Sequence, residues 1–164
     1  MNSVWIVVMG VSGCGKSSLG DALAKELALP LIEGDDFHPP ANVEKMRAGI
    51  ALADADRAGW LDVLGAELAA HSKGGVLTCS ALKRAYRDRL RAAVPGLRFV
   101  FMELTRDEAE RRVAARAAQH MFPASLVANQ FATLESPVGE AGVLAVDATA
   151  SLGELVAQAK AWVN

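Results

Sequence analysis

Five short apolar runs recur along the chain, separated by longer segments in which apolar residues return at helical spacing. The runs span residues 4–9, 30–32, 75–80, 97–104 and 142–148, and the first is continuously apolar and rich in β-branched side chains. A strand that is apolar at every position is buried on both faces, as in a parallel sheet covered by helices. The alternation of such strands with helices predicts an α/β fold with a five-stranded parallel sheet and helices on both faces.

The segments between the runs predict the helices. They span residues 16–27, 41–48, 54–70, 85–94, 106–118 and 123–134. The clearest is 54–70, where Trp60, Leu61, Leu64 and Leu68 lie on one side of a helix. A last helix begins after Ser151, with Glu154 three residues on, which is the pattern of a capping box. With no internal repeat and no linker, we expect residues 1–164 to form a single domain.

The sequence GVSGCGKS, residues 10–17, joins the first predicted strand to the first predicted helix and matches the G-x-x-x-x-G-K-[ST] phosphate-binding loop. In such a loop, backbone N–H groups and the positive end of the helix dipole bind phosphate oxygens. Lys16 is expected to reach the β- and γ-phosphates, and the Ser17 hydroxyl to bind Mg²⁺. We therefore expect ATP and Mg²⁺ as cofactors. The expected ATP-binding residues of this segment are Gly10, Val11, Ser12, Gly13, Cys14, Gly15, Lys16, Ser17 and Ser18.

The loop alone does not distinguish kinases from GTPases and motor ATPases, which share it. A chain of 164 residues with one sheet suits a small-molecule or nucleotide kinase. The base-reading motif Asn-Lys-x-Asp of GTPases does not occur in the sequence.

Glu33, Asp35 and Asp36 form an acidic cluster directly after the second predicted strand. Ligands of open parallel sheets bind at the carboxyl ends of the strands, so these acids are expected beside the phosphate loop. An aspartate could instead cap the helix that follows. Three carboxylates so close together repel one another unless a cation or a donor compensates, which favours a functional role. Asp35 is the principal candidate.

Two clusters of basic residues are candidates for binding anions. Lys83, Arg84 and Arg87 follow the third predicted strand and could face an anionic substrate. The alternative is a solvated helix face, which is preferred for Arg89 and Arg91. Arg112 and Arg116, four residues apart, could close over ATP or belong to an exposed helix paired with acidic residues.

The composition of the chain limits the classes of partner that we expect it to bind. The net charge is −2 and aromatic residues make up 5% of the chain, which argues against nucleic acid or an anionic membrane surface as a partner. No apolar run approaches the roughly 18 residues of a membrane helix. Cys14 and Cys79 lack metal-like spacing. We therefore expect a reduced, cytoplasmic protein without a disulfide or a signal peptide.

Four segments of the chain resemble the gluconokinase family, within the shikimate-kinase-like group of P-loop kinases. They span residues 9–17 (MGVSGCGKS), 33–61 (from EGDDFHPPANVEKM to DRAGWL), 79–91 (CSALKRAYRDRLR) and 120–137 (HMFPASLVANQFATLESP). They lie in the family's order and cover most of the chain. Glu33 stands where the family commonly has an aspartate.

The resemblance implies a P-loop NTPase fold with a helical lid near residues 112–135, a homodimer, and transfer of the ATP γ-phosphate to the 6-hydroxyl of D-gluconate. It implies catalytic roles for Lys16, Asp35 and Arg116, ATP contacts for Arg112 and Arg116, and metal contacts for Ser17 and Asp35. The implied substrate-binding residues are Asp35, His38, Lys45, Lys83, Arg84, Arg87 and His120. The alternatives are a related kinase acting on shikimate or another sugar acid, and an ATP-binding module without acceptor chemistry.

Overall fold

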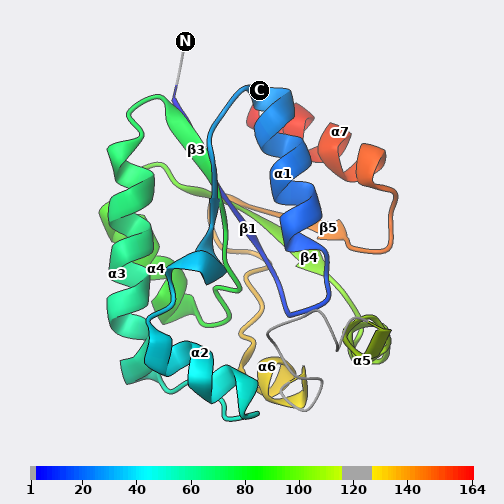
Figure 1. Cartoon of the computed structure of the whole chain (residues 1–164). Helices are drawn as coiled ribbons and strands as arrows, with labels where there is room; N and C mark the ends of the chain where they lie inside the picture. The colour runs from blue at the N-terminus through cyan, green and yellow to red at the C-terminus, as the bar shows by residue number, and fades with distance from the viewer. Residues whose placement is uncertain (1–2, 116–126) are drawn as a thin grey trace.

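The computed structural model describes residues 3–115 and 127–164 and contains one five-stranded sheet (Figure 1). The strands are β1 (Val4–Met9), β2 (Leu31–Glu33), β3 (Gly74–Thr78), β4 (Arg98–Glu103) and β5 (Val143–Asp147). All four pairings are parallel, and the order across the sheet is β2-β3-β1-β4-β5. The predicted five-stranded parallel sheet is therefore confirmed, with strand ends that differ from the prediction by at most two residues.

The helices are α1 (Lys16–Leu27), α2 (Pro40–Arg47), α3 (Asp54–Ala70), α4 (Arg84–Ala93), α5 (Arg106–Ala115), α6 (Val127–Thr133) and α7 (Leu152–Val163). The bounds of α1 and α3 are those predicted. Ser151 caps α7, since its Oγ accepts a hydrogen bond from the Glu154 N–H at 3.2 Å. Parts of the predicted helices 106–118 and 123–134, and of the predicted lid, fall on residues 116–126, which lie outside the described residues.

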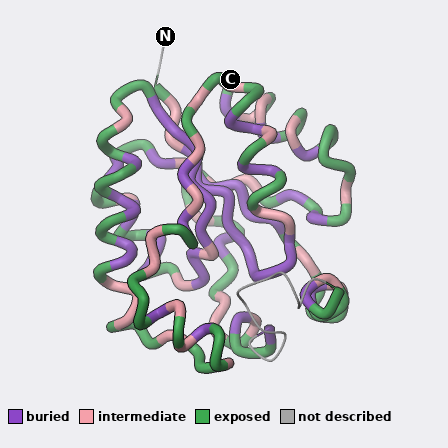
Figure 2. Tube along the Cα trace, viewed as in Figure 1, coloured by how far each residue is buried: buried purple, intermediate pink, exposed green. Residues whose placement is uncertain are grey.

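The sheet separates two hydrophobic layers (Figures 1 and 2). Ile6 and Val8 of β1 belong to the layer under α1 and α7, whereas Val7 and Met9 belong to the layer under α3 and α4. Successive strand side chains point to opposite faces, so a continuously apolar strand supplies both layers at once. This is why the apolar runs of the sequence predicted the buried strands.

Asp35 and Asp36 of the acidic cluster lie in a short 3₁₀ turn, η1 (Gly34–Phe37), that was not predicted, whereas Glu33 ends β2. A Cβ on Gly34 would lie 2.3 Å from the Thr78 carbonyl oxygen, so glycine is needed for this close approach of η1 to β3. The Trp60 indole N–H donates to the Gly34 carbonyl at 2.8 Å and ties α3 to the turn. The N-cap of α2 is Pro39, with no side-chain hydrogen bond, so the alternative in which an aspartate caps this helix is wrong.

Candidate functional site

The phosphate loop connects β1 to α1 in a conformation that its glycines permit. Gly13 and Gly15 have φ values of +87° and +97°, which side chains rarely tolerate. The Lys16 ammonium group donates to the carbonyl oxygens of Gly10 and Val11 at 3.1 and 3.2 Å. The cation therefore lies over its own loop, within reach of phosphate bound there.

The carboxylate of Glu33 lies on the first turn of α1. Its Oε2 accepts hydrogen bonds from the Ser17 hydroxyl at 3.0 Å and from the Thr78 hydroxyl at 2.6 Å. Because β2, β3 and β1 are parallel, the end of β2 and the phosphate loop lie at the same edge of the sheet. A hydroxyl and a carboxylate are oxygen ligands of the kind that Mg²⁺ prefers.

The structure thus brings Glu33 to Ser17, the side chain expected at the metal, and places Asp35 differently, beside His38. The metal contact of Asp35 stays a prediction. Over residues 3–115 and 127–164, no three His, Cys, Asp or Glu side chains gather as a metal-binding group. A magnesium ion at Ser17 and Glu33 would therefore need nucleotide phosphates as further ligands, as is usual for Mg²⁺ in kinases.

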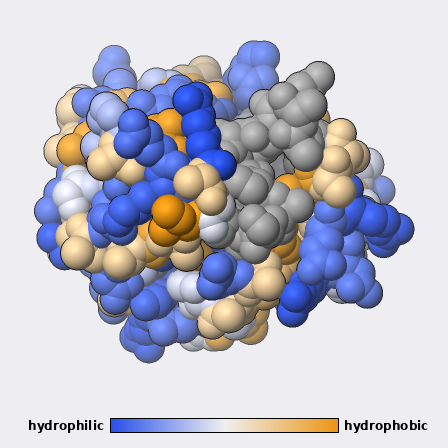
Figure 3. Space-filling view, turned by 60° about the horizontal axis from the view of Figure 1, so that its bottom comes forward, coloured by the Kyte–Doolittle hydropathy of each residue, from blue (hydrophilic) through white to orange (hydrophobic). Residues whose placement is uncertain are grey.

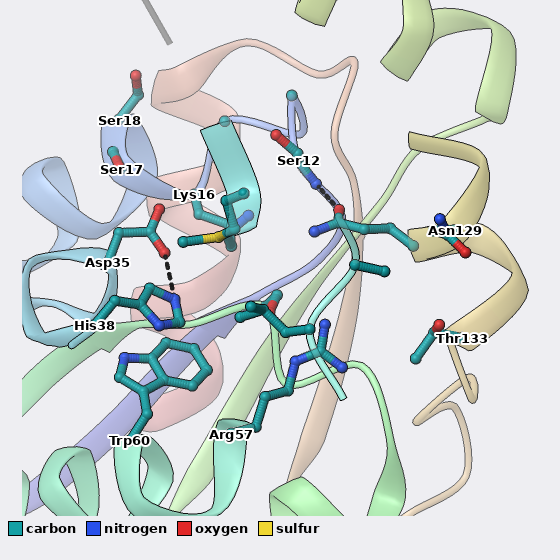
Figure 4. Close-up of a pocket in the computed structure, with 17 residues that line it drawn as sticks. Ser12, Lys16, Ser17, Ser18, Asp35, His38, Arg57, Trp60, Asn129 and Thr133 are labelled. Atoms are coloured by element: carbon teal, nitrogen blue, oxygen red, sulfur yellow. Dashed lines mark hydrogen bonds and ion pairs between the residues drawn. The ribbon is translucent and has the colours of Figure 1, made fainter. Parts of the chain in front are cut away.

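A pocket opens beside the loop, between the first turn of α1, η1, α3 and α6 (Figure 4). Asp35 and His38 lie on one side of it, and Arg57, Asn129 and Thr133 on the other. Its lining residues are Ser12, Gly13, Gly15, Lys16, Ser17, Ser18, Asp35, His38, Met46, Ala51, Leu52, Arg57, Trp60, Ser80, Asn129, Gln130 and Thr133. Seen from the end of the molecule where α2, α5 and α6 lie, the coloured surface is mainly hydrophilic with scattered hydrophobic residues (Figure 3).

His38 is a neighbour of Asp35, and the surroundings of its ring determine which ring nitrogen carries the hydrogen. The His38 ring stacks on Trp60 with centroids 4.0 Å apart, and its Nε2 lies 3.7 Å from Asp35 Oδ1. Burial lowers the pKa of His38, and the nearby Asp35 carboxylate opposes this only in part, so the ring is neutral at pH 7. The Asn42 amide nitrogen lies 3.3 Å from Nδ1 and can donate only if Nδ1 is unprotonated. The ring hydrogen is therefore on Nε2, facing Asp35.

Arg57 is a pocket residue that the sequence reasoning did not single out. It is half-buried at the first turn of α3, and NH1 donates to the Tyr86 hydroxyl at 2.9 Å. Within the described part of the chain, its guanidinium forms no ion pair. The segment DRAGWL could have indicated this position, because Arg57 and Trp60 are one helical turn apart and therefore lie on the same side of the helix. Position in the pocket and an uncommitted charge make Arg57 suitable for an anionic group.

The lysines and arginines expected at the substrate do not line the pocket. Lys45 pairs with Asp56 at 2.9 Å and Lys83 with Asp54 at 3.0 Å. The side chain of Arg84 is 68% exposed and lies 3.7 Å from Asp88.

Arg87 is completely buried. Its guanidinium donates to Glu140 and to the carbonyl oxygens of Ala81 and Glu135. The structure does not support the predicted contact of Arg87 with substrate, because these contacts occupy the group inside the protein.

The α6 side of the pocket reaches the phosphate loop directly. The Ser12 N–H donates to the Gln130 Oε1 atom, and the buried Ser12 hydroxyl has no hydrogen-bond partner among the described residues. The sequence reasoning missed Asn129, Gln130 and Thr133, because amides and hydroxyls on a short helix carry no distinctive pattern.

Arg112 of α5 lies against the other side of the loop. Its NH1 donates to the carbonyl oxygens of Gly13 and Cys14 at 3.2 and 3.3 Å, and NH2 to that of Ala148 at 3.4 Å. This placement suits the predicted ATP contact, which stays a prediction. Arg116 and His120 lie outside the described residues.

Comparison with known proteins decides the family. A family model described as an AAA domain matches residues 5–137. A gluconokinase of Gluconobacter oxydans is 46% identical over 145 residues, covering 87% of this chain and 81% of the relative. This chain belongs to the gluconokinase family. The thermoresistant gluconokinase of Escherichia coli is 40% identical and covers 92% and 88% of the two chains. A crystal structure of a gluconokinase from Sinorhizobium meliloti 1021 has a TM-score of 0.88 at 48% identity, covering 96% and 90%.

The gluconokinase resemblance and the P-loop kinase fold expected from the sequence are thereby confirmed. Every residue that lines the pocket falls within the matched range 5–137. None of the helices that the structure describes has the length and hydrophobicity needed to span a membrane.

Proposed function

We propose that this gluconokinase family member transfers the γ-phosphate of ATP to the 6-hydroxyl of D-gluconate. The observation that carries the proposal is a pocket in which the phosphate loop meets an acid, Asp35, and a cation, Arg57. The loop suits the donor phosphates, the acid suits a hydroxyl, and the cation suits a carboxylate. The names of the curated relatives support gluconate over other sugar acids.

The nucleotide half of the site consists of the loop backbone, Lys16 and the pair Ser17–Glu33. Ser17 and Glu33 would hold Mg²⁺, which neutralises phosphate charge when it is bound with ATP. Lys16 binds the β- and γ-phosphates, and Arg112 supports the loop through its carbonyl contacts. In phosphoryl transfer the protein contributes mainly positioning and charge neutralisation, and these groups supply both.

The acceptor half consists of Asp35 and Arg57. The Asp35 side chain is 62% exposed on the pocket side, so its carboxylate is free to accept the proton of the attacking hydroxyl. The Nε2–H of neutral His38 faces the same carboxylate, with Nε2 lying 3.7 Å from Asp35 Oδ1. The guanidinium of Arg57 presents a fork of N–H donors that matches a carboxylate, and so holds the far end of gluconate.

Release of ADP, measured with a panel of acceptors and in their absence, tests this proposal. We expect turnover with D-gluconate and much less with shikimate or other sugar acids. Asp35→Asn should lower kcat by about 10²- to 10⁴-fold, the usual contribution of a positioned base, while ATP binding persists. ATP binding without gluconate-dependent ADP formation would favour the non-catalytic module instead. Turnover with shikimate alone would favour the related kinase.

We further propose a homodimer located in the cytoplasm, on the family resemblance. Light scattering of the purified chain at several concentrations tests the oligomeric state. A molecular mass that stays at the monomer value of 17.3 kDa would contradict the dimer.

A further inference from the structure

The first turns of α3 and α4 meet at one buried phenol beside the pocket. Tyr86 is 6% exposed, and its hydroxyl contacts Asp54 Oδ1 and Arg57 NH1. Lys83 donates to the same Asp54 oxygen at 3.0 Å. The charges of Arg57 and Lys83 also lie 5.2 and 5.7 Å from the centre of the Tyr86 ring. One phenol thus connects a pocket residue to an ion pair outside the pocket.

The direction of the hydrogen bonds in this network is determined by its chemistry. The Tyr86 hydroxyl has one hydrogen, and Asp54 can accept it but has none to give. Hydrogen bonds from Tyr86 and then from Lys83 lower the pKa of Asp54, so it is ionised at neutral pH. The hydrogen therefore points to Asp54, and the phenol oxygen is left to accept from Arg57. Reversal is excluded because a guanidinium has no lone pair to offer.

We infer that Tyr86, held by Asp54 and Lys83, is a positioning residue that aims the Arg57 guanidinium at the carboxylate of the acceptor substrate. The inference rests on the proposed function. One N–H of Arg57 is used on Tyr86, and a guanidinium has five, so enough donors remain for a bidentate contact. A long arginine side chain loses rotamer freedom when it binds, and prior ordering by Tyr86 reduces that cost. Lys83, expected to touch the substrate, then acts through Asp54.

A purely structural role, in which the network only joins α3 to α4, makes a different prediction. The same two helices are also joined by the exposed pair Asp62–Arg89, with distances of 2.6 and 2.9 Å. Asp62→Asn is therefore a matched control, since it weakens a link between the same helices without touching the pocket.

Steady-state kinetics of Tyr86→Phe tests the inference, because this variant keeps the ring and both cation contacts and removes only the hydroxyl. We expect the KM for gluconate to rise about tenfold, as when a hydrogen bond to a charged group is lost, with the KM for ATP and kcat nearly unchanged. Asp62→Asn should leave all three constants unchanged. In an Arg57→Met background, Tyr86→Phe should have no further effect on the KM for gluconate.

Two results would overturn the inference while the proposed function stands. One is an unchanged KM for gluconate in Tyr86→Phe. The other is a rise that persists in the Arg57→Met background. A wild-type protein without gluconate-dependent turnover would overturn the proposed function and the inference together. Thermal unfolding of each variant distinguishes a folding defect from these outcomes. If Tyr86→Phe does not fold, Asp54→Asn, which keeps an oxygen acceptor, takes its place.

Discussion

The buried ion pair between Arg87 and Glu140 should stabilise this protein far more than its surface ion pairs do. The Arg87 side chain is 0% exposed and that of Glu140 is 11% exposed. The guanidinium donates twice to the carboxylate, at 3.1 and 2.6 Å. Its remaining contacts, at 2.8 Å each, are the carbonyl oxygens of Ala81 and Glu135. Glu140→Ala would leave the cation buried with neutral acceptors only.

The expected loss of stability in Glu140→Ala can be compared with the loss when one partner of an exposed ion pair is removed. Removing one partner of a buried ion pair costs about 3–5 kcal/mol. At roughly 2–4 °C per kcal/mol for a chain of this size, Glu140→Ala should lower Tm by about 10 °C. Asp62→Ala, whose partner Arg89 is 47% exposed, should lower Tm far less, because solvent screens an exposed ion pair. Calorimetry or circular dichroism of both variants gives the comparison, and equal shifts in Tm would refute the reasoning.

The same pair predicts an acid dependence of stability. Burial by itself would raise the pKa of Glu140, but hydrogen bonds from Arg87 and Arg91 and their charges outweigh it and lower the pKa. A lowered folded-state pKa stabilises the protein above the ordinary carboxylate pKa of about 4.3, and this stabilisation disappears as pH falls through the folded value. The Tm difference between wild type and Glu140→Ala should therefore shrink below about pH 4. A difference as large at pH 3 as at pH 7 would contradict it. The KM for gluconate should not change in this variant, because Arg87 lies outside the pocket.

Two further substitutions test the nucleotide half of the site. Glu33→Gln removes the negative charge beside Ser17. It should raise the Mg²⁺ concentration needed for half-maximal velocity by about 10–100-fold. An unchanged magnesium titration would exclude Glu33 from the metal site. Gln130→Glu keeps an oxygen for the Ser12 N–H but places a negative charge at the phosphate loop, so ATP should bind more weakly by about tenfold or more in calorimetry. Wild-type affinity in Gln130→Glu would show that the phosphates bind away from this contact.

Much of the fold could be predicted because its determinants are local. The apolar runs matched the strands to within one or two residues, and the helix periodicity of 16–27 and 54–70 matched α1 and α3. The 3₁₀ turn η1 was missed because nothing local specifies it. It depends on Gly34 touching the carbonyl of Thr78, a contact between residues 44 positions apart.

The candidate site was predicted less evenly. The phosphate loop and Asp35 were singled out because a motif and an acidic cluster after a strand stand out in a sequence, and both line the pocket. Among the cations, Arg87 was expected at the substrate and is buried on Glu140, whereas Arg57 was not singled out and lines the pocket. The spacing of residues in the sequence predicts the helix face on which an arginine lies. It does not predict which groups that face contacts in the folded protein.

The sequence by itself determined the alternation of strands and helices, the position of the phosphate loop and the family, because each is written in neighbouring residues. Only the tertiary structure decided which charged side chains pair with other groups of the protein and which remain available to bind a ligand. Glu33 meets Ser17, Arg87 meets Glu140 and Arg57 meets Tyr86 through packing of elements distant in the chain. A charged side chain acquires its role from the partner that it finds after folding, and the partner is set by the arrangement of the sheet and its helices.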